Sequence, residues 1–185
     1  LRLDITAVAD VRAGSVARVA YTLTNTGEAS RTGQLALVVR PYQVLPPWQE
    51  LNVTGGVSPI GMLDFRGGVV MVNGSPMIRP ATKPDRFIAS AFQSPDPVEM
   101  LGQFGELLER ADDPARLASG AQGYGFDLAA GQSRQVVIEV CLDKNGDGFR
   151  ATKNPAEFDD ALSEARAAWT AELNKVNLSL PASAR

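Results

Sequence analysis

The chain has 185 residues, of which 18 are basic and 21 acidic, so its formal net charge is −3, and it contains no histidine. A chain of this length fits one domain with a sizeable core. The missing histidine excludes Ser/His and Cys/His catalysis and His-ligated metal sites, since no other unperturbed side chain titrates near neutrality or offers an imidazole ligand. The single cysteine, Cys141, excludes an internal disulfide. The weak negative charge disfavours nucleic acid as a partner.

The start of the sequence does not resemble the start of a whole protein. The first residues, Leu1-Arg2-Leu3-Asp4, are neither an initiator methionine nor a signal-peptide pattern, so we expect a piece of a longer protein. No apolar run approaches the ~18–20 residues of a membrane span, and we expect none. One cysteine is compatible with either a cytosolic or an exported protein, with an exported location, periplasmic or secreted, the favoured of the two.

Period-two alternation predicts strands in the first 45 residues. Apolar and polar side chains alternate through residues 2–9, 18–24 and 34–39. In the first of these segments Leu3 and Ile5 face one way while Arg2 and Asp4 face the other. These patterns are typical of half-buried strands.

Further strands follow in a tight meander and in a late pair. Arg66-Gly67-Gly68 and Asn73-Gly74 supply residues that accept positive φ at hairpin turns. The expected strands cover residues 62–65, 69–72, 77–78, 124–128 and 134–142. Because they show no βαβ rhythm, the sequence predicts a mainly β fold, an antiparallel β-sandwich of about eight or more strands with two peripheral helices.

Start signals predict the two helices. Asp96-Pro97-Val98-Glu99 provides an N-cap acid and an early proline for an inserted helix near residues 97–110. Asn154-Pro155-Ala156-Glu157 opens a longer helix, whose apolar stripe runs from Phe158 to Val176. We therefore expect a sandwich domain over residues 1–153. Residues 154–185 would be a helix and linker that pack on the sandwich or lead to a missing domain.

Asp143-Lys144-Asn145-Gly146-Asp147-Gly148 matches the first half of a calcium loop. Asp143, Asn145 and Asp147 would supply oxygen ligands at positions 1, 3 and 5, with glycine at position 6 for the turn. Position 12 is Asn154 instead of glutamate, and the preceding segment reads as a strand. A polar turn between a strand and a helix is therefore the alternative to a Ca²⁺ site.

The sequence offers little for catalysis. Ser58 lacks the nucleophile-elbow pattern, and Cys141 lies in an apolar strand, where a thiol usually serves packing. A glycosidase carboxylate pair is defined by separation in space, so composition does not exclude one. No catalytic residue is assigned.

The proline-rich segment 40–60 combines aromatic rings with amides. Rings provide apolar area and amides give directed hydrogen bonds, which are the ingredients of a domain interface or a carbohydrate platform. The alternative is an ordered loop that plugs the end of the sandwich. The candidate binding or interface residues are Tyr42, Gln43, Trp48, Gln49 and, on the last helix, Trp169.

A resemblance extends over most of the chain. The run RPYQVLPPWQELNVTGGVSPI, the DFRGGVVMVNG hairpin, the GYGFDLAAGQSRQVVIEV pair and the helix with Trp169 resemble the N-terminal β-sandwich of large bacterial proteins similar to glycoside hydrolases. In that family a sandwich of the galactose-mutarotase type (a supersandwich) precedes a helical linker and an (α/α)6 toroid that holds the catalytic acids. The DKNGDG loop is not part of the shared pattern.

The resemblance implies a non-catalytic accessory domain of a carbohydrate-active protein. Its partner would be a catalytic domain of the same chain, on which it packs and which it orients. A stand-alone carbohydrate- or partner-binding module, stabilised by calcium, is the alternative, and an enzyme in its own right is a third hypothesis.

Overall fold

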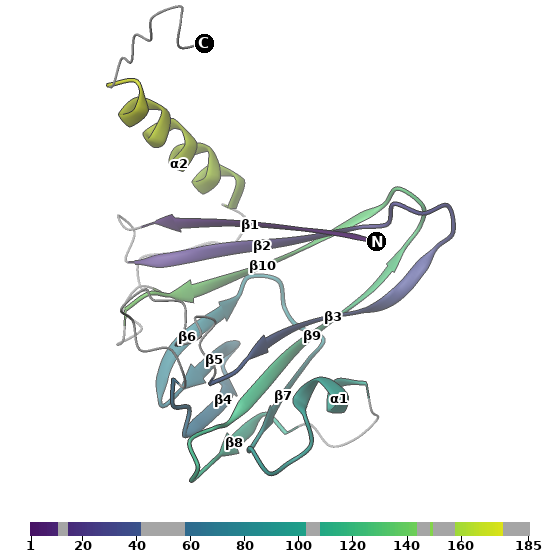
Figure 1. Ribbon diagram of the computed structural model, residues 1–185, viewed down its shortest axis with the longest axis vertical. Coiled ribbons are helices and arrows are strands. Elements are labelled where there is room, and N and C mark those ends of the chain that lie inside the picture. The colour runs from purple at the N-terminus through teal and green to yellow at the C-terminus, as the bar shows by residue number, and fades with distance from the viewer. Residues whose placement is uncertain (11–14, 42–57, 103–107, 144–148, 150–157, 176–185) are drawn as a thin grey trace, which may run out of the picture.

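The computed structural model describes residues 1–10, 15–41, 58–102, 108–143, 149 and 158–175. Within these residues the chain forms ten strands and two helices, and every pairing between the strands of a sheet is antiparallel. The strands form two sheets (Figure 1), which confirms the mainly β, sandwich-like class predicted from the sequence. Neither described helix is long and apolar enough to cross a membrane.

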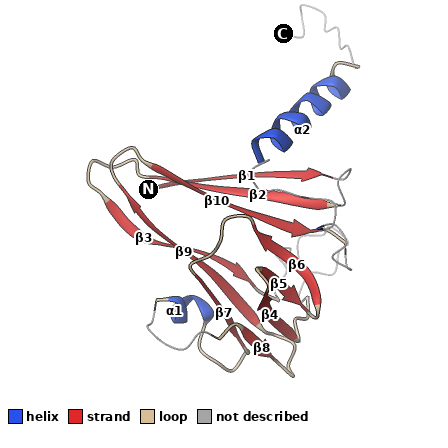
Figure 2. Ribbon diagram, turned by 180° about the vertical axis from the view of Figure 1, so that it is seen from behind, coloured by secondary structure: helices blue, strands red, loops and turns tan. Residues whose placement is uncertain are grey.

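The larger sheet has seven strands and the smaller has three (Figure 2). In sheet order, the larger consists of β1 (Arg2–Asp10), β2 (Val16–Thr24), β10 (Ser133–Cys141), β6 (Ser75–Pro80), β5 (Val69–Val72), β4 (Met62–Arg66) and β8 (Arg110–Asp112). The smaller consists of β3 (Arg31–Val39), β9 (Ser119–Leu128) and β7 (Arg86–Ser90). β1 is therefore an edge strand of the larger sheet.

The hairpin turns form where the sequence predicted them. Gly67 and Gly68 connect β4 to β5 with φ of 59° and 81°, and Asn73 and Gly74 connect β5 to β6 with φ of 51° and 86°. Glycine reaches these left-handed conformations without a steric cost from Cβ, and asparagine tolerates them better than most residues. The turn residues thus set the register of the meander.

The main core lies between the two sheets. Leu63 of β4 and Val70 of β5 pack with Phe87 and Ala89 of β7, and all four are almost fully buried. The Phe87 ring stacks on Phe65 with 5.1 Å between the ring centroids. Because the partners come from both sheets, this cluster holds the layers together.

Backbone hydrogen bonds link the sheets at one end. The Ala89 N–H of β7 donates to the Leu108 carbonyl at 2.6 Å, and the Phe65 N–H of β4 donates to the Glu109 carbonyl at 2.9 Å. Residues 108 and 109 therefore bridge the small sheet to the large one. The two sheets are thus joined through the backbone at this end.

The inserted helix is shorter than predicted. α1 spans Pro97–Leu101 with Gly102 as its C-cap, so the expected helix near residues 97–110 is wrong in its extent. Arg110 instead begins β8, and the backbone at residues 108 and 109 pairs with β7 and β4. The start signal was correct, since the Asp96 carboxylate caps the helix by accepting the Val98 N–H at 2.8 Å.

Candidate functional site

The first half of α2 (Phe158–Leu173) is docked on the large sheet. Phe158 is 5% exposed and packs with Val8, Ala20 and Val137, which come from β1, β2 and β10. The partly buried residues of the helix that complete this contact are Ala161, Leu162 and Ala165. They recur at helical spacing, so one stripe of α2 covers one face of the sheet.

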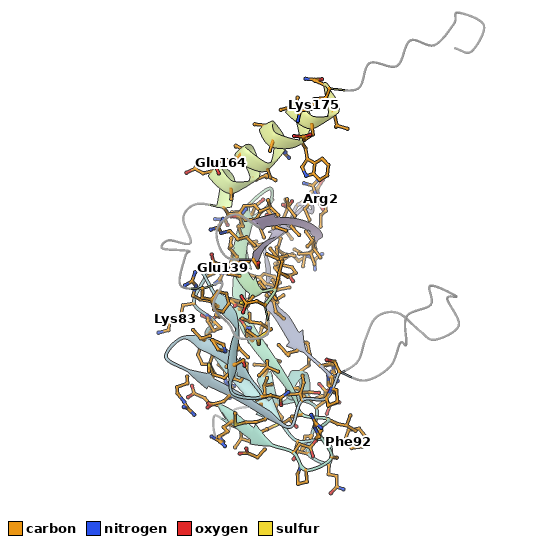
Figure 3. The ribbon with its side chains drawn as sticks, turned by 90° about the vertical axis from the view of Figure 1, so that its left-hand side faces the viewer. Arg2, Lys83, Phe92, Glu139, Glu164 and Lys175 are labelled. Atoms are coloured by element: carbon orange, nitrogen blue, oxygen red, sulfur yellow. The ribbon has the colours of Figure 1, made fainter. Side chains whose placement is uncertain are left out.

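The second half of α2 continues the same stripe without a comparable contact. Trp169 and Leu173 follow Ala165 by four and eight residues, and in the described chain they are 69% and 67% exposed. At 1.5 Å per residue, the stripe runs about 12 Å beyond Ala165. Figures 1 and 3 show α2 rising past β1, with Lys175 at its far end. We call Trp169 and Leu173 the outer stripe.

β1 and the residue before it carry a second exposed apolar row. Leu1, Leu3 and Ile5 are 57%, 44% and 60% exposed, although alternation predicted that such residues would be half-buried. They lie on the face opposite Val8, toward the smaller sheet, because Leu3 pairs with Leu23, which lines the space between the sheets. The predicted alternation of side chains along this strand was right, but the smaller sheet does not bury these apolar side chains of β1.

A buried ion cluster joins three strands of the large sheet, β2, β10 and β6. Glu139 of β10 accepts from the Arg18 Nε of β2 at 3.1 Å and from the Arg79 Nε of β6 at 2.6 Å. The Glu139 side chain is 1% exposed and the Arg18 side chain 5%. Arg18 and Glu139 both fall in predicted strands, but no pattern in the sequence indicates that they meet, since 121 residues separate them.

The same cluster holds one end of the proposed calcium loop. The Arg79 guanidinium lies 4.9 Å from the centre of the Phe149 ring and donates to the Phe149 carbonyl at 3.2 Å. At the other end, the Asp143 carboxylate accepts from the Cys141 thiol at 3.1 Å. Asn145 and Asp147 lie outside the described residues, so calcium binding stays a prediction. Within the described ranges, no three acidic or cysteine side chains gather as metal ligands.

Most of the proline-rich segment lies outside the described residues, and with it Tyr42, Gln43, Trp48 and Gln49. The residues that flank this gap come together, since the Ser58 N–H donates to the Pro41 carbonyl at 2.5 Å. Arg40 pairs with Asp96, the N-cap of α1, at 2.6 Å. Of the five predicted interface residues, the structure therefore places only Trp169, and it is exposed.

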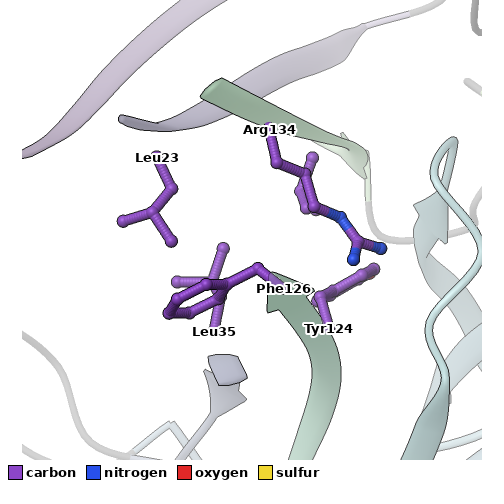
Figure 4. A pocket seen from close by; sticks show the side chains of 6 residues that line it. Leu23, Leu35, Tyr124, Phe126 and Arg134 are labelled. Carbon is purple, nitrogen blue, oxygen red and sulfur yellow. The ribbon is translucent and has the colours of Figure 1, made fainter. Parts of the chain in front are cut away.

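A small apolar hollow lies between the sheets (Figure 4). It is lined by Leu23, Leu35, Tyr124, Phe126, Arg134 and Val136. Its cavity volume is about 10 Å³, far below the roughly 300 Å³ of a small-molecule pocket. Burial, and then the negative charge of Asp85, raise the pKa of the Tyr124 hydroxyl above its usual range. That hydroxyl donates to the Gln122 side chain at 2.7 Å, so the hollow is part of the packing.

The buried carboxylates among the described residues have structural partners. Asp64 accepts from Arg66 at 2.5 Å. Asp113 accepts from three backbone N–H groups, those of Phe92, Ala115 and Leu117, at 2.9–3.1 Å. Burial alone would raise the pKa of Asp113, but these three hydrogen bonds lower it below its usual range. Together with Glu139, these acids hold turns and strands in place.

No protein-family model matches the sequence, and no curated protein matches it. The fold defines the class as a mainly β protein of two antiparallel sheets. A functional conclusion therefore depends on the surfaces described above. Among the described large apolar side chains, Trp169 and Leu173 of the outer stripe are the most exposed.

Proposed function

We propose that this chain is a non-catalytic accessory domain of a carbohydrate-active protein, which packs on a helical catalytic domain of the same polypeptide and orients it. The observation that carries the proposal is the outer stripe. A helix that buries Phe158 and leaves Trp169 69% exposed offers a prepared apolar contact. The family resemblance of the sequence supplies the identity of the partner.

The buried carboxylates favour a structural role for this domain over a catalytic one, because they already have hydrogen-bond partners. Glycoside hydrolysis needs two carboxyl groups flanking a sugar in a cleft. The buried acids of the described residues are engaged by arginines or backbone N–H groups. The described hollow is too small for a sugar ring.

Trp169 fluorescence tests the proposal. In a Trp48→Phe background, Trp169 is the single indole of residues 1–185 and is expected to emit like an exposed tryptophan and to be quenched by acrylamide. In the chain extended by the residues that follow Arg185 in its gene, we expect blue-shifted emission and at least about five-fold weaker quenching, because the partner domain covers the ring.

A matched pair of variants locates the contact. Trp169→Ala with Leu173→Ala should lower the melting temperature of the extended chain and leave that of residues 1–185 unchanged. Phe92→Ala, at a 56% exposed position away from α2, is the control and should change neither. Equal quenching of Trp169 in both chains, or a stop codon directly after Arg185, would overturn the proposal.

A further inference from the structure

The outer edge of β1 is a surface that the docking of α2 does not use. In the described part of the chain no strand pairs with this edge, which is nine residues long. Natural edge strands are commonly protected from pairing by proline, by charged side chains, lysine above all, or by a bulge. β1 contains neither proline nor lysine, and its pairing with β2 is regular throughout. The backbone groups of β1 are thus a template for an added strand.

The charges of β1 show which strand fits there. On one face, Arg2 Nε lies 2.8 Å from Asp4 Oδ2, and the two side chains are 64% and 49% exposed. On the other face lie the exposed Leu1, Leu3 and Ile5. Residues 1–5, which include the first four residues of β1, therefore carry opposite charges on either side of Leu3, flanked by the large apolar Leu1 and Ile5. This arrangement makes the segment complementary to an antiparallel copy of itself.

We infer that the occupant is a second copy of this chain, paired through β1 about a two-fold axis at Leu3. Arg2 then lies opposite Asp4 of the second copy, and Asp4 opposite its Arg2. Leu1 lies opposite Ile5 of the second copy, and Leu3 opposite its counterpart. Directly opposite pairs of this kind stabilise an antiparallel ladder. The two seven-stranded sheets become one continuous sheet.

Charge complementarity selects this register over its neighbours. A two-fold axis at Asp4 places the two Asp4 carboxylates against each other, which is unfavourable. An axis at Thr6 gives a longer overlap but sets Leu3 and Ile5 against the small Ala9 and Ala7. The axis at Leu3 places opposite charges against each other in both Arg2–Asp4 pairs. It also places each of the six large apolar side chains against another large apolar side chain.

Sedimentation velocity of residues 1–185 over about 5 to about 500 µM tests the inference. We expect the average mass to rise from one chain toward two with concentration. Arg2→Asp alone, or Asp4→Arg alone, places like charges opposite each other and should raise the dissociation constant about ten-fold. The double variant Arg2→Asp with Asp4→Arg restores opposite charges and should return it to that of the original chain.

The opposite edge of the sheet provides a matched control. In β8, Arg110 and Asp112 form the same exposed pair two residues apart, at 2.7 Å. Asp112→Arg should leave the dissociation constant unchanged. Circular dichroism checks that each variant is folded. A chain that stays monomeric over the whole range, a double variant as weak as either single one, or an equal effect of Asp112→Arg would overturn the inference. None of these outcomes depends on the docking of α2.

Discussion

Glu139 of β10 accepts a hydrogen bond from Arg18 of β2 at 3.1 Å, and both side chains are buried. The two residues are direct partners in the antiparallel register, and Arg79 of β6 is the partner of Glu139 on its other side. One buried anion therefore links three neighbouring strands. A slip of one residue would move Glu139 to the other face, away from both arginines.

Glu139→Gln should lower the free energy of unfolding by about 3–5 kcal/mol, because it removes the buried carboxylate that pairs with both Arg18 and Arg79. Urea unfolding at pH 7 measures this loss. Glu164→Gln, on the exposed side of α2, is the control and should change the value by less than about 0.5 kcal/mol. Equal effects of the two variants would contradict the structural role of the cluster.

The two halves of α2 should respond differently to truncation. Phe158→Ala removes a ring that is 5% exposed and should cost about 3–5 kcal/mol in urea unfolding of residues 1–185. Trp169→Ala should cost less than about 0.5 kcal/mol there, because the ring is 69% exposed. A large loss of unfolding free energy for Trp169→Ala in residues 1–185 would mean that the outer stripe is already packed within this domain.

Gly120 of β9 lies against Leu63 of the opposite sheet. A Cβ at this position would contact Leu63 Cδ2 inside the van der Waals distance and lie 3.1 Å from the Phe87 ring and 3.2 Å from the Ile88 carbonyl. Gly120→Ala should therefore lower the free energy of unfolding by about 1–3 kcal/mol through overpacking. Gly27→Ala, whose nearest contact would be 3.5 Å away, is the control for urea unfolding. Similar losses in both would argue against tight packing at Gly120.

Acid should destabilise the protein below about pH 4, where unfolded aspartates titrate. The folded-state pKa of Asp113 is lowered, because the hydrogen bonds from the N–H groups of Phe92, Ala115 and Leu117 outweigh its burial. A lowered folded pKa stabilises the protein above the unfolded pKa, and this contribution is lost as the pH falls through the folded value. Asp113→Asn should be less stable at pH 7 and show a shallower loss between about pH 4 and pH 2 in urea unfolding. An unchanged slope would rule out this contribution.

Local sequence signals predicted the hairpin turns and the start of α1 correctly, because they act over a few residues, but they missed β7 and β8. The turns at Gly67-Gly68 and Asn73-Gly74 depend on residues that accept positive φ, and the structure has both. The N-cap at Asp96 was equally local. The extent of α1 was not set by local signals, because the backbone at residues 108 and 109 pairs with β7 and β4. The predicted calcium ligands and the proline-rich interface stay predictions.

By itself, the sequence determined the fold class, the period of the strands and the apolar stripe of α2, since all three follow from side-chain order along the chain. Only the tertiary structure decided that β1 is an edge strand, that Arg18 meets Glu139 and that Trp169 lies beyond the docked half of its helix. The physical reason is that strand order and the reach of a helix past a sheet depend on contacts between distant segments. The alternation of residues in a single strand is the same at the edge of a sheet as at its centre.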